Sequence, residues 1–292
     1  PGQPHAEVEA LRAAGTAAAG ATLYVTLEPC SHTGRTGPCV EAIIEAGVSR
    51  VVVGIEDPDP QVAGSGLAAL GAAGIEVTLG VQARKVRTQL APYLKHRTTG
   101  RPWVVLKLAA TLDGGTAAPN GSSQWITSPP ARVDGHRLRA ESDAILVGAG
   151  TVRRDDPSLT VRDYHPPVVP QQRSLDPLRI VLGKADEAAK VQPCRQMGGD
   201  LGAVLDELGA GGVVQLLVEG GAATAGDFHR AGLVDRYVIY VAPALFGGDD
   251  ANGLFEGAGA WDIGDVWRGR FVGVERVGAD LRIELAADEE AD

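Results

Sequence analysis

Two short motifs near the start of the chain constrain its fold more than any other feature. One is His5-Ala6-Glu7, and the other runs from Pro29-Cys30 to Pro38-Cys39. Histidine and cysteine are side chains that zinc binds readily, and a site with three protein ligands keeps a fourth position for water. Since these ligands are far apart in the sequence, the chain between them must fold back on itself. The motifs therefore predict a zinc site that organises the first part of the chain.

The glutamate of the first motif indicates what this site does. Glu7 is too close to His5 to be a comfortable fourth ligand, but it is well placed to transfer protons. His-x-Glu with paired Pro-Cys is typical of zinc-dependent base deaminases, in which the metal activates water. Two alternatives stay open: a structural zinc site with His32 as its fourth ligand, and two unrelated cysteines. Of these interpretations we expect catalysis.

The residues around both motifs are typical of helix starts. A helical run over 6–14 ends at Gly15, and a second run over 40–46 follows Cys39. The start of a helix has free N–H groups and the positive end of the helix dipole. We therefore expect the second helix to lower the pKa of the Cys39 thiol, which favours the thiolate that zinc binds.

Length and charge limit the possible functions. A chain of 292 residues, 44% of them hydrophobic, suggests two domains with two filled cores. The net charge of −10 argues against general nucleic-acid binding, which needs basic patches, but it is compatible with a small phosphorylated substrate. We find no run long enough to span a membrane and no signal peptide. Because the chain starts at Pro1, we expect that it lacks its natural beginning.

The three cysteines indicate the compartment. Cys30 and Cys39 belong to the metal motif, and we expect Cys194 to be an unpaired thiol. Few cysteines, two of them with metal spacing, are typical of a reducing compartment. We therefore expect the protein to be cytoplasmic.

Apolar runs rich in β-branched residues alternate with helical runs along the chain. This alternation predicts parallel strands with helices on the faces of the sheets. The expected strands are 21–27, 50–55, 75–79, 102–110, 143–147, 178–182, 213–218 and 237–241, followed by a hairpin of 271–277 and 280–285. The expected helices are 6–14, 40–46, 64–73, 81–96, one that begins near Ser128, 201–208 and 222–231. A linker over 97–100 gives expected domains of 1–98 and 99–292.

Three features of the second half mark candidate site residues. Lys107 interrupts an apolar strand, where it is costly to bury without a partner; a solvent-facing edge position is the alternative. Gly148-Ala149-Gly150 follows a strand, and a glycine loop there lets backbone N–H groups approach a phosphate or diphosphate. Glu219-Gly220-Gly221 likewise follows a strand and precedes a helix. The segment 183–199 shows no helical or strand periodicity.

Both halves together resemble one family. The second half contributes Leu106-Lys107, Leu112-Asp113-Gly114, Trp125-Ile126-Thr127, Gly150-Thr151-Val152, Asp155-Asp156-Pro157 and Val218-Glu219-Gly220-Gly221. With the zinc motifs, they make the whole chain resemble the bifunctional deaminase/reductase of bacterial riboflavin biosynthesis. The resemblance implies an α/β fold: a cytidine-deaminase-like three-layer first domain, without the family's initial strand pair and helix, and a dihydrofolate-reductase-like second domain.

The resemblance also implies two reactions and two cofactors. Zinc-dependent hydrolysis would deaminate 2,5-diamino-6-(5-phosphoribosylamino)pyrimidin-4(3H)-one, and NADPH would then reduce its ribosyl group to ribityl. The partner would be this small phosphorylated pyrimidine, with no nucleic acid and no membrane. The family resemblance further suggests a homo-oligomer, either a dimer or a tetramer.

Site residues follow from the same resemblance, position by position. Zinc would be held by His5, Cys30 and Cys39, and Glu7 would move protons. Substrate contacts are expected from Arg35, Lys107, Ser123, Arg139, Leu159, Arg162 and Glu219. NADPH contacts are expected from Ala109, Trp125, Thr127, Gly148, Thr151, Asp155, Gly220 and Gly221.

The chain departs from the family pattern beyond its start, and other functions stay open. Gln124 and Gly115 stand where family members usually or often have a basic residue, and 183–199 is short and lacks the strand usually found there. One alternative is a reductase whose first domain is an inactive zinc-binding appendage. Others are a nucleoside or tRNA deaminase, which the acidic charge disfavours, and a non-enzymatic zinc module, which Glu7 disfavours.

Overall fold

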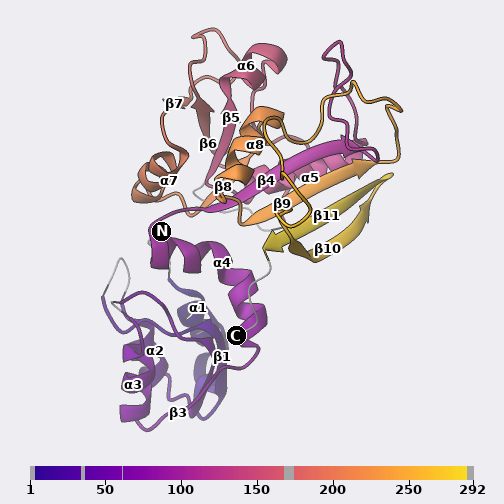
Figure 1. The fold of residues 1–292 in the computed structure, drawn as a ribbon. Helices are drawn as coiled ribbons and strands as arrows, with labels where there is room; N and C mark the ends of the chain where they lie inside the picture. Colours follow the sequence, from indigo (N-terminus) through magenta and orange to yellow (C-terminus); the bar gives the residue numbers. More distant parts are fainter. Residues whose placement is uncertain (1–3, 34–36, 61, 168–173, 288–292) are drawn as a thin grey trace. The chain divides into compact units, whose positions relative to one another are not determined.

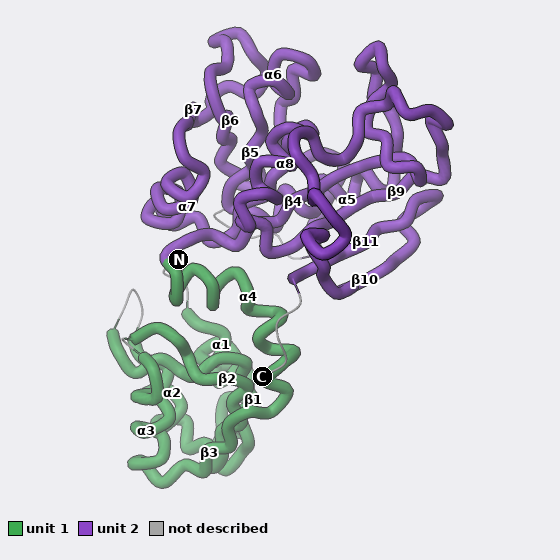
Figure 2. The backbone as a smooth tube through the Cα atoms, in the orientation of Figure 1, with its two compact units in different colours: residues 1–99 green, residues 100–292 purple. Residues whose placement is uncertain are grey.

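The computed structural model describes residues 4–33, 37–60, 62–167 and 174–287. The chain forms two compact units, Pro1–Thr99 and Gly100–Asp292 (Figure 2). Each unit has its own sheet. Both units combine parallel strands with helices, as the alternation in the sequence predicts. In the described ranges, no helix has both the length and the apolar character needed to cross a membrane. The assignment of one activity to residues 1–98 and of the other to residues 99–292 stays a prediction.

The first unit is built on a parallel sheet in the order β1-β2-β3. Its strands are β1 (Thr22–Leu27), β2 (Arg50–Ile55) and β3 (Glu76–Leu79). Its helices are α1 (Ala6–Ala14), the short 3₁₀ helix η1 (Gly15–Ala18), α2 (Cys39–Glu45), α3 (Ser65–Ala72) and α4 (Ala83–Thr99). The central strand β2 is the most buried of the three, in keeping with its run of valines.

Successive residues of β2 face two different helix layers. An apolar cluster joins one face to α2 and α3, and its buried members include Val40, Ile43, Val51, Val53 and Leu70. On the opposite face Gly54 lies against α4, where an added Cβ would be 2.7 Å from Val86 Cγ2. Both faces of the sheet are therefore covered, which leaves the strand ends and helix starts to carry polar groups.

The second unit has an eight-stranded sheet in the order β10-β11-β9-β4-β8-β5-β6-β7 within the described residues (Figure 1). Its strands are β4 (Trp103–Thr111), β5 (Ala144–Gly148), β6 (Leu178–Leu182), β7 (Arg195–Met197), β8 (Gln215–Val218), β9 (Arg236–Ala242), β10 (Gly269–Val277) and β11 (Asp280–Ala287). Its helices are α5 (Pro129–Ala140), α6 (Ala149–Asp155), α7 (Leu201–Ala210) and α8 (Ala222–Arg230). The strands from β9 to β7 are parallel, whereas the β10–β11 hairpin pairs antiparallel with β9.

Helices cover both faces of this sheet. Leu106 of β4 belongs to the core cluster with α7 and α8, whereas the adjacent Val105 belongs to the cluster with α5 and α6. Because β4, β5 and β8 run parallel, their carboxyl ends meet at one edge of the sheet. Ligands bind at this edge in open α/β sheets.

The expected linker over 97–100 is wrong. The helix α4 continues to Thr99, and the hydroxyl groups of Thr98 and Thr99 donate to carbonyls one turn earlier. Gly100, with a φ of +73°, follows the end of the helix. Polar residues of this kind are compatible both with a linker and with an exposed helix end.

Two expectations in the second unit also differ from the structure. The helix α6 begins directly at Ala149, so Gly150 lies inside a helix and not in a loop. The segment 183–199 does not lack a strand, because Arg195–Met197 forms β7 and pairs with β6. Arg195 and Gln196 are exposed, and an edge strand of three residues leaves no hydrophobic pattern in the sequence.

Candidate active sites

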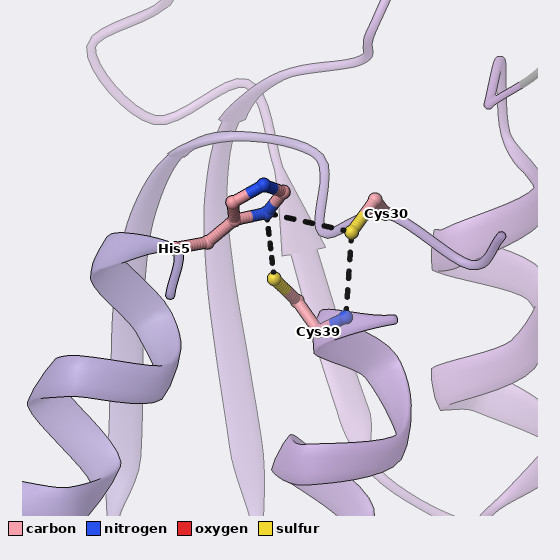
Figure 3. Close-up of side chains that lie close together, drawn as sticks. All are labelled: His5, Cys30 and Cys39. Atoms are coloured by element: carbon pink, nitrogen blue, oxygen red, sulfur yellow. Dashed lines mark hydrogen bonds between the residues drawn. The ribbon is translucent and has the colours of Figure 1, made fainter. Parts of the chain in front are cut away.

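The two metal motifs converge in the first unit (Figure 3). His5 directly precedes α1, Cys30 lies in the loop after β1, and Cys39 begins α2. His5 Nδ1 is 3.1 Å from Cys39 Sγ and 3.6 Å from Cys30 Sγ. Nitrogen and sulfur ligands of a tetrahedral zinc ion lie about 3.5 Å apart at the usual bond lengths. The three side chains are therefore spaced to hold zinc.

Cys30 also stabilises the start of α2. The Cys39 N–H group donates to Cys30 Sγ at 3.3 Å, and the Val40 N–H group donates to the Cys30 carbonyl at 3.2 Å. The first N–H groups of a helix have no partner within the helix, so they need acceptors of this kind. The loop after β1 and the start of α2 thus hold two of the three ligands in a fixed relation.

The prediction that the helix start lowers the pKa of the Cys39 thiol is wrong, because the surrounding groups of the protein raise this pKa. Cys39 is fully buried, and burial raises the pKa of its thiol. The charge of Glu7 and the neighbouring Cys30 raise this pKa further, and the helix start donates its N–H group to Cys30 instead. An anionic Cys39 therefore depends on the positive charge of a metal ion.

Glu7 and His32 differ in their relation to the three ligands. Glu7 is half-buried, and its effect on the pKa of Cys39 places its carboxylate near the cluster. His32 is exposed, and the potential metal-ligand group found in the described part of the chain contains only His5, Cys30 and Cys39. This favours an open fourth position over a four-ligand structural site. Arg35 lies outside the described residues.

A buried carboxylate fixes the loop that carries Cys30. Glu28 is 3% exposed. It accepts hydrogen bonds of 2.8–3.2 Å from the backbone N–H groups of Asp57, Gly64, Gly66 and Leu67. The last two belong to the start of α3, where the helix dipole also favours an anion. Glu28 therefore ties the Cys30 loop to a segment that follows β2.

The second unit contains a cavity of about 510 Å³, a size suited to a small-molecule ligand. It lies near the carboxyl ends of β4 and β8 and beside α6 and the start of α8. Eight of the expected reductase residues line it: Lys107, Ala109, Ser123, Thr151, Asp155, Glu219, Gly220 and Gly221. The fold thus brings together residues from four separate parts of the chain.

Glu219 is held in this cavity by an ion pair with little exposure to water. The side chains of Arg139 and Glu219 are only 14% and 11% exposed. Burial alone would raise the pKa of Glu219, but the charge and hydrogen bonds of Arg139 lower it to about 2, with a smaller contribution from Lys107. Glu219 is therefore a carboxylate at any physiological pH.

Lys107 lies beside this carboxylate, and the alternative of an edge position is wrong. Its strand β4 is flanked by β8 and β9, and the side chain is half-buried. Lys107 Nζ lies 5.8 Å from the centre of the Tyr240 ring, and its charge helps to lower the pKa of Glu219. The aromatic ring and the carboxylate offset the cost of placing a lysine in an apolar strand.

Two of the glycines pack against Thr224 of α8. A Cβ at Gly148 would lie 2.6 Å from Thr224 Oγ1, and one at Gly220 would lie 2.5 Å from Thr224 Cβ. The Gly221 N–H group donates to Thr151 Oγ1 at 3.1 Å, which joins the starts of both helices. These glycines are needed for packing, and contacts of Gly148 and Gly220 with NADPH stay predictions.

The remaining expected residues do not line this cavity in the described structure. Leu159 is buried in the core, and Arg162 donates to hydroxyl groups of its own loop. Trp125 is exposed, with the Arg132 guanidinium 4.7 Å from its ring centre, and Arg132 also donates to the Thr127 carbonyl. Contacts of these residues with substrate or NADPH stay predictions.

Sequence reasoning missed the other residues that line the cavity. They are Leu108, Thr116, Ala117, Arg154, Ala222 and the six residues 251–256. The segment 251–256 belongs to the long connection between β9 and β10, which has no regular secondary structure apart from an isolated bridge. Arg154 could have been found as a basic residue next to Asp155, but 251–256 carries no sequence signal of a site.

Two family models match the chain. The cytidine and deoxycytidylate deaminase zinc-binding region matches residues 1–55, and the RibD C-terminal domain matches residues 102–283. The riboflavin biosynthesis protein RibD of Escherichia coli is 42% identical over 97% of this chain and 87% of that protein. Its counterpart in Mycobacterium tuberculosis is 45% identical over 98% of this chain and 84% of that protein.

Solved structures are similar over the same extent. RibD of Acinetobacter baumannii has a TM-score of 0.90 and 37% identity, covering 99% of this chain and 86% of that one. A diaminohydroxyphosphoribosylaminopyrimidine deaminase/5-amino-6-(5-phosphoribosylamino)uracil reductase from Thermotoga maritima has a TM-score of 0.83 and 32% identity, covering 98% and 86%. The similarity therefore includes both units.

Proposed function

The chain belongs to the RibD family, and from this premise we propose how its residues carry out the two reactions of that family. It is a bifunctional enzyme of riboflavin biosynthesis, with a zinc-binding deaminase domain and an NADPH-dependent reductase domain. The resemblance and the α/β fold expected from the sequence are confirmed. The reductase-only alternative is disfavoured by the match to the zinc-binding region and by the converging ligands.

The deamination is assigned to the first unit. The substrate is a small phosphorylated pyrimidine, in this proposal 2,5-diamino-6-(5-phosphoribosylamino)pyrimidin-4(3H)-one. His5, Cys30 and Cys39 would hold zinc, which when bound makes a water molecule nucleophilic near neutral pH. Glu7 would take a proton from this water and pass it to the amine that leaves as ammonia. The observation that carries the assignment is the convergence of the three ligands beside Glu7.

The reduction is assigned to the cavity of the second unit. NADPH supplies the hydride for the ribosyl carbon, so the protein has to bind NADPH and the substrate, orient them and stabilise the charge that develops. Thr151, Asp155 and the glycine pair at the start of α8 would face the dinucleotide. Lys107, Ser123 and Glu219 would face the sugar, with Arg139 holding Glu219 in place. Eight predicted residues in one cavity support this assignment.

Two measurements test the assignment of the first step. Cys30→Ser should lower the zinc content of the purified protein, since one of three ligands is lost. Glu7→Gln should keep its zinc but release ammonia about 10²–10⁴-fold more slowly, because glutamine cannot accept the proton. Full ammonia release by Glu7→Gln would move proton transfer to another group, and an unchanged zinc content in Cys30→Ser would overturn the ligand set.

We also expect a cytoplasmic homo-oligomer, either a dimer or a tetramer. The sheet edge at β10 exposes Phe271 and Val274, which are 70% and 56% exposed, and this apolar edge supports self-association. Light scattering of the purified protein at several concentrations would measure the mass, and a monomer at all of them would contradict the expectation.

A further inference from the structure

One wall of the cavity in the second unit is a segment without regular structure apart from an isolated bridge. All six residues over 251–256 line the cavity, and they lie in the connection between β9 and β10. Connections of this kind are the parts of a protein that open most easily, unless specific contacts hold them. Three sets of contacts hold this wall.

The first set joins the backbone of the wall to two neighbouring segments. The Thr116 N–H group donates to the Asn252 carbonyl at 2.7 Å, and the Asn252 N–H group donates to the Ala117 carbonyl at 3.0 Å. At the other end, the Glu256 N–H group donates to the carbonyl of Ala222 at 3.0 Å. Ala222 begins α8 and directly follows the glycine pair that lines the cavity.

Arg230, in the last turn of α8, supplies the second set. Its Nη1 donates to the Glu256 carbonyl at 2.8 Å. Two glycines permit this close approach: a Cβ at Gly226 would lie 2.3 Å from the Glu256 oxygen, and one at Gly257 would lie 2.5 Å from Arg230 Nη1. Gly257 also has a φ of +105°, a backbone conformation that other residues rarely adopt.

The third set is aromatic. The centre of the Phe255 ring lies 5.0 Å from the centre of the His229 ring. His229, like Arg230, belongs to α8. His229 Nδ1 is 2.7 Å from the Tyr237 hydroxyl oxygen, so the cluster is anchored to β9. The wall is therefore attached to α8 by its backbone, by a ring contact and by Arg230.

We propose that Arg230 is a positioning residue of the reductase, which holds residues 251–256 as a preformed wall of the NADPH site. The inference rests on the proposed placement of NADPH in this cavity. A wall that is ordered beforehand spares the ligand the entropic cost of ordering it. Without Arg230 the bound complex can still form the same contacts, so affinity should fall while the chemical step changes little.

The test is the affinity of the full-length, zinc-loaded protein for NADPH, measured by fluorescence titration. Arg230→Ala should raise the Kd roughly tenfold, the effect of losing one hydrogen bond from a charged donor. The kcat at saturating NADPH should change less than about twofold, and Arg230→Lys should restore part of the affinity. Asp227→Ala is the matched control, because it removes only the exposed helical partner of Arg230 and should leave the Kd unchanged.

Cleavage after Glu256 by a glutamate-specific protease gives an independent readout. Cleavage should be faster in Arg230→Ala and in Gly257→Ala than in the unmodified protein, and NADPH should suppress it in all three. Unchanged affinity and unchanged cleavage in Arg230→Ala would overturn the proposal. If Arg230→Ala does not fold, Gly257→Ala decides the question by the same two measurements.

A further variant separates this proposal from the placement of NADPH. Gly221→Val puts a side chain into the cavity at the start of α8 and should abolish NADPH binding. If Gly221→Val binds NADPH normally, the cavity is not the cofactor site and the proposal falls with it. If Gly221→Val fails to bind whereas Arg230→Ala binds normally, only the role of Arg230 is wrong.

Discussion

Arg139 and Glu219 meet in a two-point contact, in which Arg139 Nε donates to Glu219 Oε1 at 2.7 Å and Nη2 donates to Oε2 at 2.9 Å. The arginine comes from α5 and the glutamate follows β8, so the contact joins a helix layer to the carboxyl edge of the sheet. Arg139 Nη1 also donates to the Thr160 carbonyl at 3.0 Å. Glu219 therefore has a fixed orientation in the cavity before any ligand binds.

Removal of Arg139 should destabilise the second unit strongly. Arg139→Leu would leave Glu219 as a buried charge without its main partner, a change that typically costs about 3–5 kcal/mol of unfolding free energy. Arg101→Leu is the control, because Arg101 and its partner Asp206 are far more exposed and the loss should be small. Urea denaturation would measure both variants. Equal effects would mean that the Arg139–Glu219 pair adds nothing beyond a surface ion pair.

The Arg139–Glu219 pair should make the free energy of unfolding depend on pH in the acidic range. The pKa of Glu219 is about 2 in the folded protein, below its ordinary value of 4.5. A group with a lowered pKa stabilises the fold fully above the unfolded value, and this contribution is lost as the pH falls through the folded value. The stability difference between the unmodified protein and Glu219→Gln should therefore be constant at neutral pH and shrink between pH 4.5 and 2. A difference that stays constant over that window would contradict the lowered pKa.

Glu28→Gln should weaken both the fold and the metal site of the first unit. An amide nitrogen cannot accept the N–H groups that now surround the Glu28 carboxylate, and a loss of at least about 2 kcal/mol is expected. Since Glu28 fixes the Cys30 loop, zinc should also dissociate faster during dialysis. Glu41→Gln, on an exposed position of α2, should change neither property. Identical behaviour of the two variants would show that Glu28 does not position the loop.

Lys107→Ala should slow the reductase. Loss of a charged donor at the sugar is expected to lower the rate of NADPH oxidation on deaminated substrate about a hundredfold, as for other single donors in active sites. Lys190→Ala removes an exposed lysine that pairs with Asp156 and should have little effect. A Lys107→Ala protein that is folded and fully active would remove this lysine from the site.

The residues that the sequence predicted well are those whose chemistry requires a fixed motif. His5, Cys30 and Cys39 could be found because zinc accepts few ligand types, and the alternation of apolar runs indicated most strands and helices. The role of Glu28 could not be predicted from the sequence, because its four partners come from a segment after β2. Its role depends on a tertiary contact that no local pattern contains.

The reductase cavity was predicted in part for a similar reason. Lys107 could be predicted because it is a charged residue in an apolar strand. The Glu219-Gly220-Gly221 run could be predicted because it directly follows a strand, and both line the cavity. The wall over 251–256 has no period and few charges, and it reaches the cavity only because α8 and residues 116–117 hold it there. The strand β7 was missed because two of its three residues are exposed and polar.

The measurement that tests the two-site account most directly is NADPH oxidation on supplied deaminated substrate, followed by its absorbance. The reductase residues all come from Lys107 onward, and hydride transfer from NADPH needs no metal. The rate should therefore be the same for the unmodified protein, for Glu7→Gln and for protein treated with a zinc chelator. On the diamino substrate, in contrast, chelation should stop ammonia release and NADPH oxidation together, and Glu7→Gln should slow both about 10²–10⁴-fold. If chelation stopped the oxidation of NADPH on deaminated substrate while circular dichroism showed a folded protein, zinc and NADPH would have to act in one shared site.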